Sequence, residues 1–220
     1  MKRKQIALLS VVIAAVAALF NFVGCGKAEG DKNVSQIRYD ILSAETDNYV
    51  ITAYAESREV PLKADGISGE RSNEIIVKIC SLSALSGTYS ISLTIDDKEY
   101  TATPEQRADN ILKADVPVES LPGGSFVMKI TGEKSAEAEL KSVLPGGFAE
   151  YTVPLETVKK EIKTVEKEKA SSYEYFVRVI CENGEAFWYV GYITEDKTYS
   201  YLLDASGTEI IARKTDDNRS

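Results

Sequence analysis

The stretch that decides the fold is YEYFVRVICENGEAFWYVGYI, residues 173–193. Two runs rich in β-branched and aromatic residues flank the dipeptide Asn183-Gly184. Asn-Gly between such runs is the strongest short-range signal for a β-hairpin, because both residues of the tight turn need a positive φ. The stretch therefore predicts two antiparallel strands joined by a two-residue turn.

The segments on either side extend this hairpin into a small domain. Residues 197–204 and 208–213 have the composition of two further strands. Upstream, residues 154–172 carry a narrow apolar stripe at spacings of three, four and three, formed by Leu155, Val158, Ile162 and Val165. That spacing predicts an amphipathic helix lying on the sheet. Residues 148–214 are thus expected to form an α+β domain, followed by a polar tail at residues 215–220.

Residues alternate between two faces along the strand after Asn183-Gly184. One set is Phe187, Tyr189, Gly191 and Ile193, and the other is Trp188, Val190 and Tyr192. A single helix covers only one set. We predict that Trp188 and Tyr192 lie on the uncovered face and bind a partner, because Gly191 in the other set allows a helix to approach closely. The alternative is that both faces are buried, the second by the N-terminal half of the chain.

The N-terminal half has the pattern of an antiparallel β-sandwich. In residues 88–102, Tyr89, Ile91, Leu93 and Ile95 alternate with polar residues, which is typical of a half-buried strand. Seven or eight such strands occur between residues 34 and 147, and Pro-Gly-Gly at 145–147 marks the predicted boundary. The expected fold class is mainly β, with a sandwich followed by the α+β domain.

The first 24 residues have the layout of a secretory signal. Lys2, Arg3 and Lys4 precede an apolar run at residues 6–23, and Gly24 stands before Cys25. The alternatives are an uncleaved membrane anchor, since the run is near the lower length limit for a spanning helix, and a simple cleaved signal. Removal of residues 1–24 takes the formal net charge from −8 to −11, because it removes three basic residues and no acidic one.

Charge and composition argue against several classes of function. A surface this acidic repels phosphate backbones, so no nucleic-acid partner is expected. The chain has no histidine, which rules out Ser-His-Asp and Cys-His catalysis, and we expect no metal, no cofactor and no catalytic residue. Cys80 and Cys181 are expected to be free, buried thiols, because each lies on a strand of a different predicted domain; the alternative is one disulfide.

Three segments resemble known families. Val23, Gly24 and Cys25 resemble the lipobox of bacterial lipoproteins, which implies cleavage before Cys25, a diacylglyceryl group on Cys25 and a tether at residues 25–33. Residues 116–131 resemble the last part of bacterial immunoglobulin-like domains. The helix, the strand at 187–193 and the ending YSYLLDASGTEIIAR resemble a PepSY-type domain. The last resemblance implies a binding or inhibitory module and carries no catalytic residues.

Together these features predict a lipid-anchored protein on the extracytoplasmic face of the cell membrane. Its expected role is to bind an envelope protein, peptide or polymer without catalysis. Two alternatives stay open, a structural spacer of the envelope and a hydrolase that uses carboxylates.

Overall fold

The computed structural model describes residues 33–62, 69–167 and 174–218. The predicted signal peptide, the lipidation site at Cys25 and the tether as far as residue 32 lie outside these residues. Within them the fold is mainly β, with one α-helix that continues into a π-helical turn. Residues 33–220 cluster as one unit.

Thirteen strands account for most of the described chain. Nine of them precede the helix: β1 (Val34–Glu45), β2 (Tyr49–Glu59), β3 (Arg71–Ser81), β4 (Ser90–Ile95), β5 (Lys98–Ala102), β6 (Glu105–Ala108), β7 (Ile111–Pro117), β8 (Ser125–Thr131) and β9 (Ala136–Ser142). The helix α2 (Thr152–Glu161) and the π-helical turn η2 (Ile162–Glu166) follow, and then β10 (Glu174–Glu182), β11 (Glu185–Ile193), β12 (Lys197–Leu203) and β13 (Ile210–Asp217).

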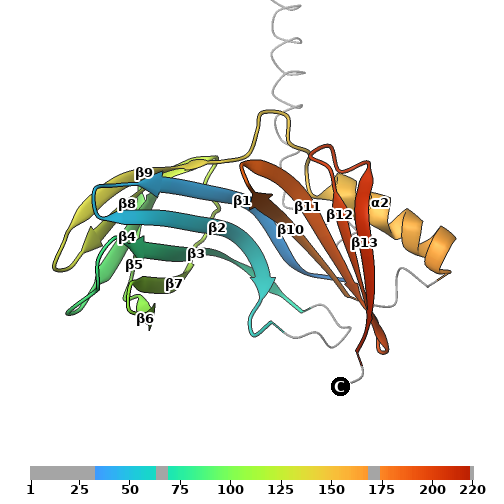
Figure 1. The fold of residues 1–220 in the computed structure, drawn as a ribbon, viewed down its shortest axis with the longest axis horizontal. Helices are drawn as coiled ribbons and strands as arrows, with labels where there is room; N and C mark the ends of the chain where they lie inside the picture. Colours follow the sequence, from blue (N-terminus) through green and yellow to red (C-terminus); the bar gives the residue numbers. More distant parts are fainter. Residues whose placement is uncertain (1–32, 63–68, 168–173, 219–220) are drawn as a thin grey trace, which may run out of the picture. The chain divides into compact units, whose positions relative to one another are not determined.

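The strands form a curled sheet that branches at β1 (Figure 1). The first part of β1, from Val34 to Arg38, pairs in parallel with β10, whereas Leu42 and Ser43 pair with the antiparallel strand β9. Strand β2 pairs along the other edge of β1. A strand that we assigned to the sandwich therefore also pairs with a strand that we assigned to the predicted α+β domain, and hydrogen bonding is continuous across the predicted boundary.

A bulge at Tyr39 marks the branch point, because the register between β1 and β2 shifts between Arg38 and Asp40. The carboxylate of Asp40 accepts hydrogen bonds from the Ile41 amide at 2.7 Å and from the Ser142 hydroxyl at 2.6 Å. Burial raises the pKa of Asp40, and these two hydrogen bonds partly offset the rise. Asp40 thus connects Ser142, at the end of β9, to the position where β1 changes its pairing from β10 to β9.

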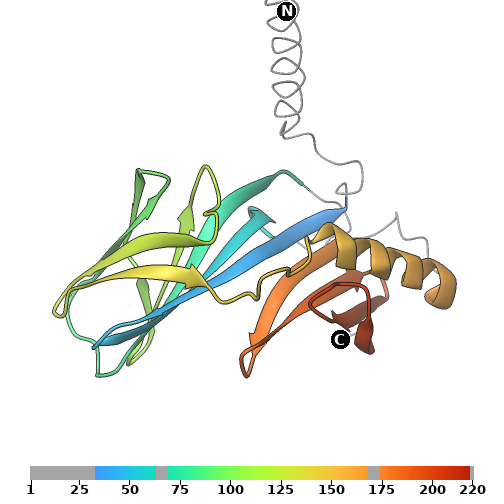
Figure 2. The ribbon, with the colours of Figure 1, turned by 90° about the horizontal axis from the view of Figure 1, so that it is seen from above.

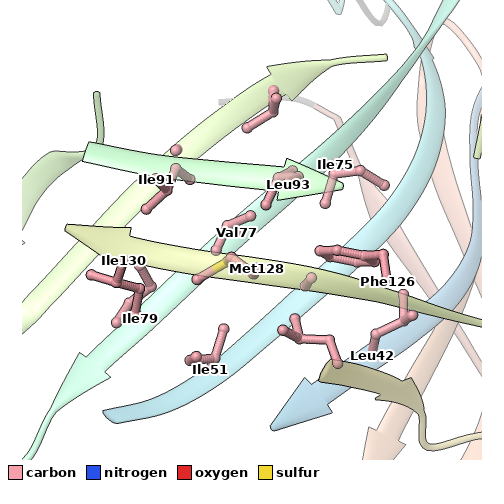
Figure 3. Packing of buried hydrophobic residues seen from close by; sticks show 14 of the residues in the cluster. Leu42, Ile51, Ile75, Val77, Ile79, Ile91, Leu93, Phe126, Met128 and Ile130 are labelled. Carbon is pink, nitrogen blue, oxygen red and sulfur yellow. The ribbon is translucent and has the colours of Figure 1, made fainter. Parts of the chain in front are cut away.

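The first apolar core lies between β1, β2, β3 and β7 on one side and β4, β8 and β9 on the other. Figure 3 shows Ile91 and Leu93 of β4 and Phe126, Met128 and Ile130 of β8 meeting the apolar side chains of β2 and β3. Tyr89, Ile91, Leu93 and Ile95 are all buried, as their alternation predicted. Asp96 and Asp97 form the two-residue turn after them, both with positive φ.

The second apolar core lies between α2 and strands β1, β10, β11 and β12. Leu155, Val158 and Ile162 pack against Val177, Trp188 and Tyr192, among others. Figure 2 shows α2 lying alongside the sheet formed by β10–β13. The predicted hairpin is confirmed, since Asn183 and Gly184 have φ values of 53° and 81° and join β10 to β11.

One prediction about this half is wrong in detail. Val165 was expected in the buried stripe, but it is 47% exposed. The π-helical turn η2 begins at Ile162 and advances each residue by a smaller angle than an α-helix, which turns Val165 out of the stripe. The predicted polar tail at residues 215–220 is exposed as far as it is described, and β13 extends into it to Asp217, which pairs with Lys197 of β12.

Candidate functional site

Strand pairing assembles a row of charged side chains across the sheet. Arg178 of β10 is in register with Arg38 of β1, Arg38 with Glu56 of β2, and Glu56 with Glu74 of β3. Neighbouring strands are about 4.8 Å apart, so these four residues stand side by side. The row has two positive charges at the β10 end and two negative charges at the β3 end. We call it the charge row.

The charge row lies on the face of the sheet opposite the alanines and valines that β2 and β10 contribute to the two apolar cores, and Tyr54 on that face packs against the edge of the second core. Along β2, Ala53 and Ala55 point into the first core, so Tyr54 and Glu56 point to the other face. Along β10, Val177 and Val179 point into the second core, so Phe176 and Arg178 share a face with Arg38. We call this side of β1, β2, β3, β10 and β11 the open face. Glu56, Gln36 and Phe176 lie on it and are themselves buried, with 0%, 3% and 7% of their surface exposed.

Hydrogen bonds join the positive half of the charge row to Glu56. The Glu56 carboxylate is fully buried and accepts from Arg38 Nε at 2.6 Å and from Gln36 Nε2 at 2.5 Å. The amide oxygen of Gln36 in turn accepts from Arg178 Nε at 2.7 Å. The side-chain amide of Gln36 on β1 therefore links Glu56 on β2 to Arg178 on β10.

The negative half of the charge row has its own cation. Arg58 pairs with Glu74 and, at 3.4 Å, with Asp115 of β7. Burial raises the pKa of Glu74, and the neighbouring Arg58 partly offsets the rise. Glu74 is thus held by an arginine from the adjacent strand, as Glu56 is.

Aromatic rings flank the guanidinium groups on the open face. The Arg38 guanidinium carbon lies 4.2 Å from the centre of the Tyr54 ring, and that of Arg178 lies 5.3 Å from the centre of the Phe176 ring. A cation over a ring at these distances gains from the quadrupole of the ring. Burial, and next the like charge of Arg38, lower the pKa of Arg178 from its ordinary value.

A pocket of about 430 Å³ lies beside Arg38, where β10 diverges from β1 and β9 takes its place. Apolar side chains, hydroxyl groups, one guanidinium and one thiol line it: Arg38, Ile41, Ser43, Thr52, Tyr54, Val143, Ile180 and Cys181. A mostly apolar concavity with a few polar groups is the usual form of a ligand site.

The predicted exposure of Trp188 and Tyr192 is wrong, because these side chains are only 1% and 0% exposed and belong to the second core. The helix covers their set, and the open set is the one that contains Tyr189. A Cβ added at Gly191 would lie 3.4 Å from the Tyr189 hydroxyl and 3.7 Å from the Phe176 ring. Gly191 thus makes room for two aromatic rings on the open face and not for the helix.

Sequence reasoning missed Gln36, Arg38, Glu56, Phe176 and Arg178. One signal for them was present, since Arg178 interrupts an otherwise apolar run from Tyr175 to Ile180. Charged residues inside a strand seldom point into an apolar core, so that position marked an open face. The partners of Arg178 had no such signal, because they come from residues about 140 positions away.

The two cysteines carry free thiols, but they are not both buried. Cys80 is half-buried and Cys181 is exposed. Cys181 is the penultimate residue of β10, beside the Asn183-Gly184 turn, and lies beyond the part of β10 that pairs with β1. The expectation of two buried thiols is therefore wrong, because Cys181 is exposed and Cys80 is only half-buried.

This difference predicts selective labelling. In the Cys25→Ser variant, we expect a thiol reagent such as Ellman's to react with Cys181 about tenfold faster than with Cys80, because access limits the reaction at the less exposed thiol. The check is the time course of absorbance, with Cys181→Ser as the control that removes the fast phase. In urea both thiols should react at similar rates. Equal rates in the folded protein would contradict the placement of Cys181.

The described residues hold neither a cluster of metal-ligating side chains nor a membrane-spanning helix. No group of three or more Asp, Glu or Cys side chains in that part of the chain is placed to hold a metal ion. None of the helices described there has the length and apolar character needed to cross a membrane. Comparisons with protein families, with curated proteins and with solved structures gave no match. Within the described residues, the open face is therefore the feature that points to a function.

Proposed function

We propose that this chain is a lipid-anchored extracytoplasmic protein that binds a protein or peptide of the cell envelope through the open face, without catalysis. The observation that supports the proposal is the charge row beside the pocket, where hydrogen bonds hold Arg38, Glu56 and Arg178 in fixed positions on the open face. A lipid on Cys25 anchors the chain to the membrane. No nucleic acid and no cofactor take part.

We also infer that the chain consists of two modules. Residues 34–147 form an immunoglobulin-like sandwich, and residues 148–214 form a PepSY-like module. The presence of two separate apolar cores, one under β4 and β8 and one under α2, supports this division. The shared strand β1 then joins the two modules rigidly, which suits a binding face that extends over both.

A binding role accounts for the charge row better than a spacer role does. Removing Glu56 and the two arginines from water is costly, and apolar residues of the same size often stabilise a fold as well or better. A spacer gains nothing from this arrangement. A binding site gains fixed, directional groups whose rotamers are already ordered before the partner arrives.

One observation favours the hydrolase alternative. Glu56 and Glu74 are in register on adjacent strands, and many hydrolases use a pair of carboxylates for catalysis. Each carboxylate, however, pairs with an arginine, Arg38 for Glu56 and Arg58 for Glu74. Both carboxylates are thus already occupied by a cation from the protein itself, so binding is the better supported function.

Site-specific photo-crosslinking tests the proposal. We expect a benzoylphenylalanine at position 187, on the half-exposed edge of the open face, to crosslink an envelope protein or peptide in living cells. The same residue at position 153, which is exposed on α2, is the matched control and should give no such product. Mass spectrometry identifies the crosslinked partner. Equal products at both positions, or none at either, would favour the spacer.

A further inference from the structure

The positive end of the charge row has one acid for two arginines. Glu56 receives Arg38 directly and Arg178 only through the neutral amide of Gln36. Among the described residues, Arg178 forms no ion pair of its own, and its Nε is the atom that donates to Gln36. The terminal nitrogens of a guanidinium form a planar fork that matches a carboxylate, so Arg178 retains the capacity to bind one.

The neighbourhood of Arg178 favours an anion. Arg38 stands directly opposite it in the register of β1 and β10, so two cations lie side by side where water is partly excluded. A single negative charge placed against them would offset their repulsion. The local balance of one carboxylate and two guanidiniums contrasts with the acidic balance of the whole chain, which has 34 acidic and 26 basic residues.

The surroundings also select among anions. The pocket beside Arg38 offers apolar walls at Ile41, Val143 and Ile180, which suit an apolar side chain next to the anionic group. A polyanion such as a nucleic acid or a phosphate polymer would face the net negative charge of the whole protein beyond this one spot. A peptide with one carboxylate between apolar side chains meets both the local cations and the apolar walls.

We propose that the open face binds a peptide segment with a single carboxylate, which pairs with Arg178 beside Arg38 while a flanking apolar side chain enters the adjacent pocket. This inference rests on the proposed binding function and names its class of partner. The inference adds the requirement that the partner carries a carboxylate. Peptide libraries test that requirement, whereas crosslinking tests the binding function itself.

The test uses two displayed libraries of random heptapeptides, one with Glu fixed at the centre and one with Gln, selected on the full chain in detergent. We expect enrichment from the Glu library only. The selected peptides should lose about tenfold to a hundredfold in affinity when their Glu is changed to Gln, as for a charge-assisted hydrogen-bonded pair. This comparison uses the unaltered protein, so it does not depend on the folding of any variant.

Protein variants then locate the site. Arg178→Gln should weaken the selected peptides as much as the Glu-to-Gln change in the peptide does, and Arg178→Lys should weaken them less because it keeps the charge and loses the fork. Arg107→Gln, at an exposed arginine of β6, is the matched control and should leave affinity unchanged. The peptides should also slow the labelling of Cys181, which lines the pocket, but not that of Cys80.

Several outcomes would overturn the inference. They are equal enrichment from both libraries, unchanged affinity in Arg178→Gln, no enrichment at all, or competition by polyphosphate as strong as that by the free peptide. Crosslinking from position 187 judges the proposed function separately. A partner captured there, together with failure of the libraries, would retain the binding function and remove the carboxylate requirement.

Discussion

Replacing Trp188 with alanine is expected to lower the free energy of unfolding by about 3–5 kcal/mol, the usual cost of truncating a large aromatic side chain in a core. Trp188 is 1% exposed and lies in the second core with Leu155 and Val158 of α2. Its ring centre is 5.1 Å from that of Phe148, in the segment that leads into the helix. The alanine variant would leave a cavity between helix and sheet.

Urea denaturation followed by circular dichroism measures this effect. Trp188→Phe is the conservative control, and we expect it to cost less, because it keeps an aromatic ring and removes a buried indole N–H that has no hydrogen-bond acceptor among the described residues. Phe187→Ala changes the adjacent residue on the open face and should also cost less. A midpoint for Trp188→Ala that matches the unaltered protein would show that Trp188 is not a core residue.

Replacing Cys25 with alanine is expected to abolish membrane anchoring through lipid. If Cys25 receives a diacylglyceryl group, two acyl chains hold the mature chain stably at the membrane, where a single chain would be marginal. The unaltered protein, extracted from membranes, should have the mass of a chain that begins at Cys25 plus the lipid. Cys25→Ala should retain residues 1–24 and carry no lipid.

Intact-mass analysis separates the alternatives for this segment. Cys181→Ala is the matched control, since it removes a thiol elsewhere and should be processed normally. An unaltered protein that begins at another residue and lacks lipid would indicate a simple cleaved signal. One that keeps residues 1–24 without lipid would indicate an uncleaved anchor.

Local patterns were sufficient for most of the strands and turns. The alternation from Tyr89 to Ile95 predicted a half-buried strand, and Asn183-Gly184 predicted the hairpin of β10 and β11, because these signals depend only on side-chain direction and backbone preference within a few residues. The helix was predicted for the same reason. Of the four residues predicted to form its buried stripe, only Val165 is exposed, because the π-helical turn changes the angle between successive residues.

The choice of face on β11 was not predictable in this way. Both sets of alternating residues contain aromatic side chains, so periodicity gave no preference between Trp188 and Tyr189. The structure buries Trp188 and leaves Tyr189 half-exposed, with its hydroxyl 3.0 Å from the Ser200 hydroxyl. The packing of α2 decides which face of β11 is buried, and that packing depends on the whole second core and not on Gly191.

The sequence by itself determined most of the elements described in this protein, namely its strands, its turns and the amphipathic helix α2, since each follows from preferences between near neighbours. Only the tertiary structure decided that β1 pairs with both β9 and β10 and that Arg178, Arg38, Glu56 and Glu74 stand in one row. Strand register is fixed by burial on the opposite face and by pairing over long separations. The candidate site therefore exists only once strands about 140 residues apart lie side by side.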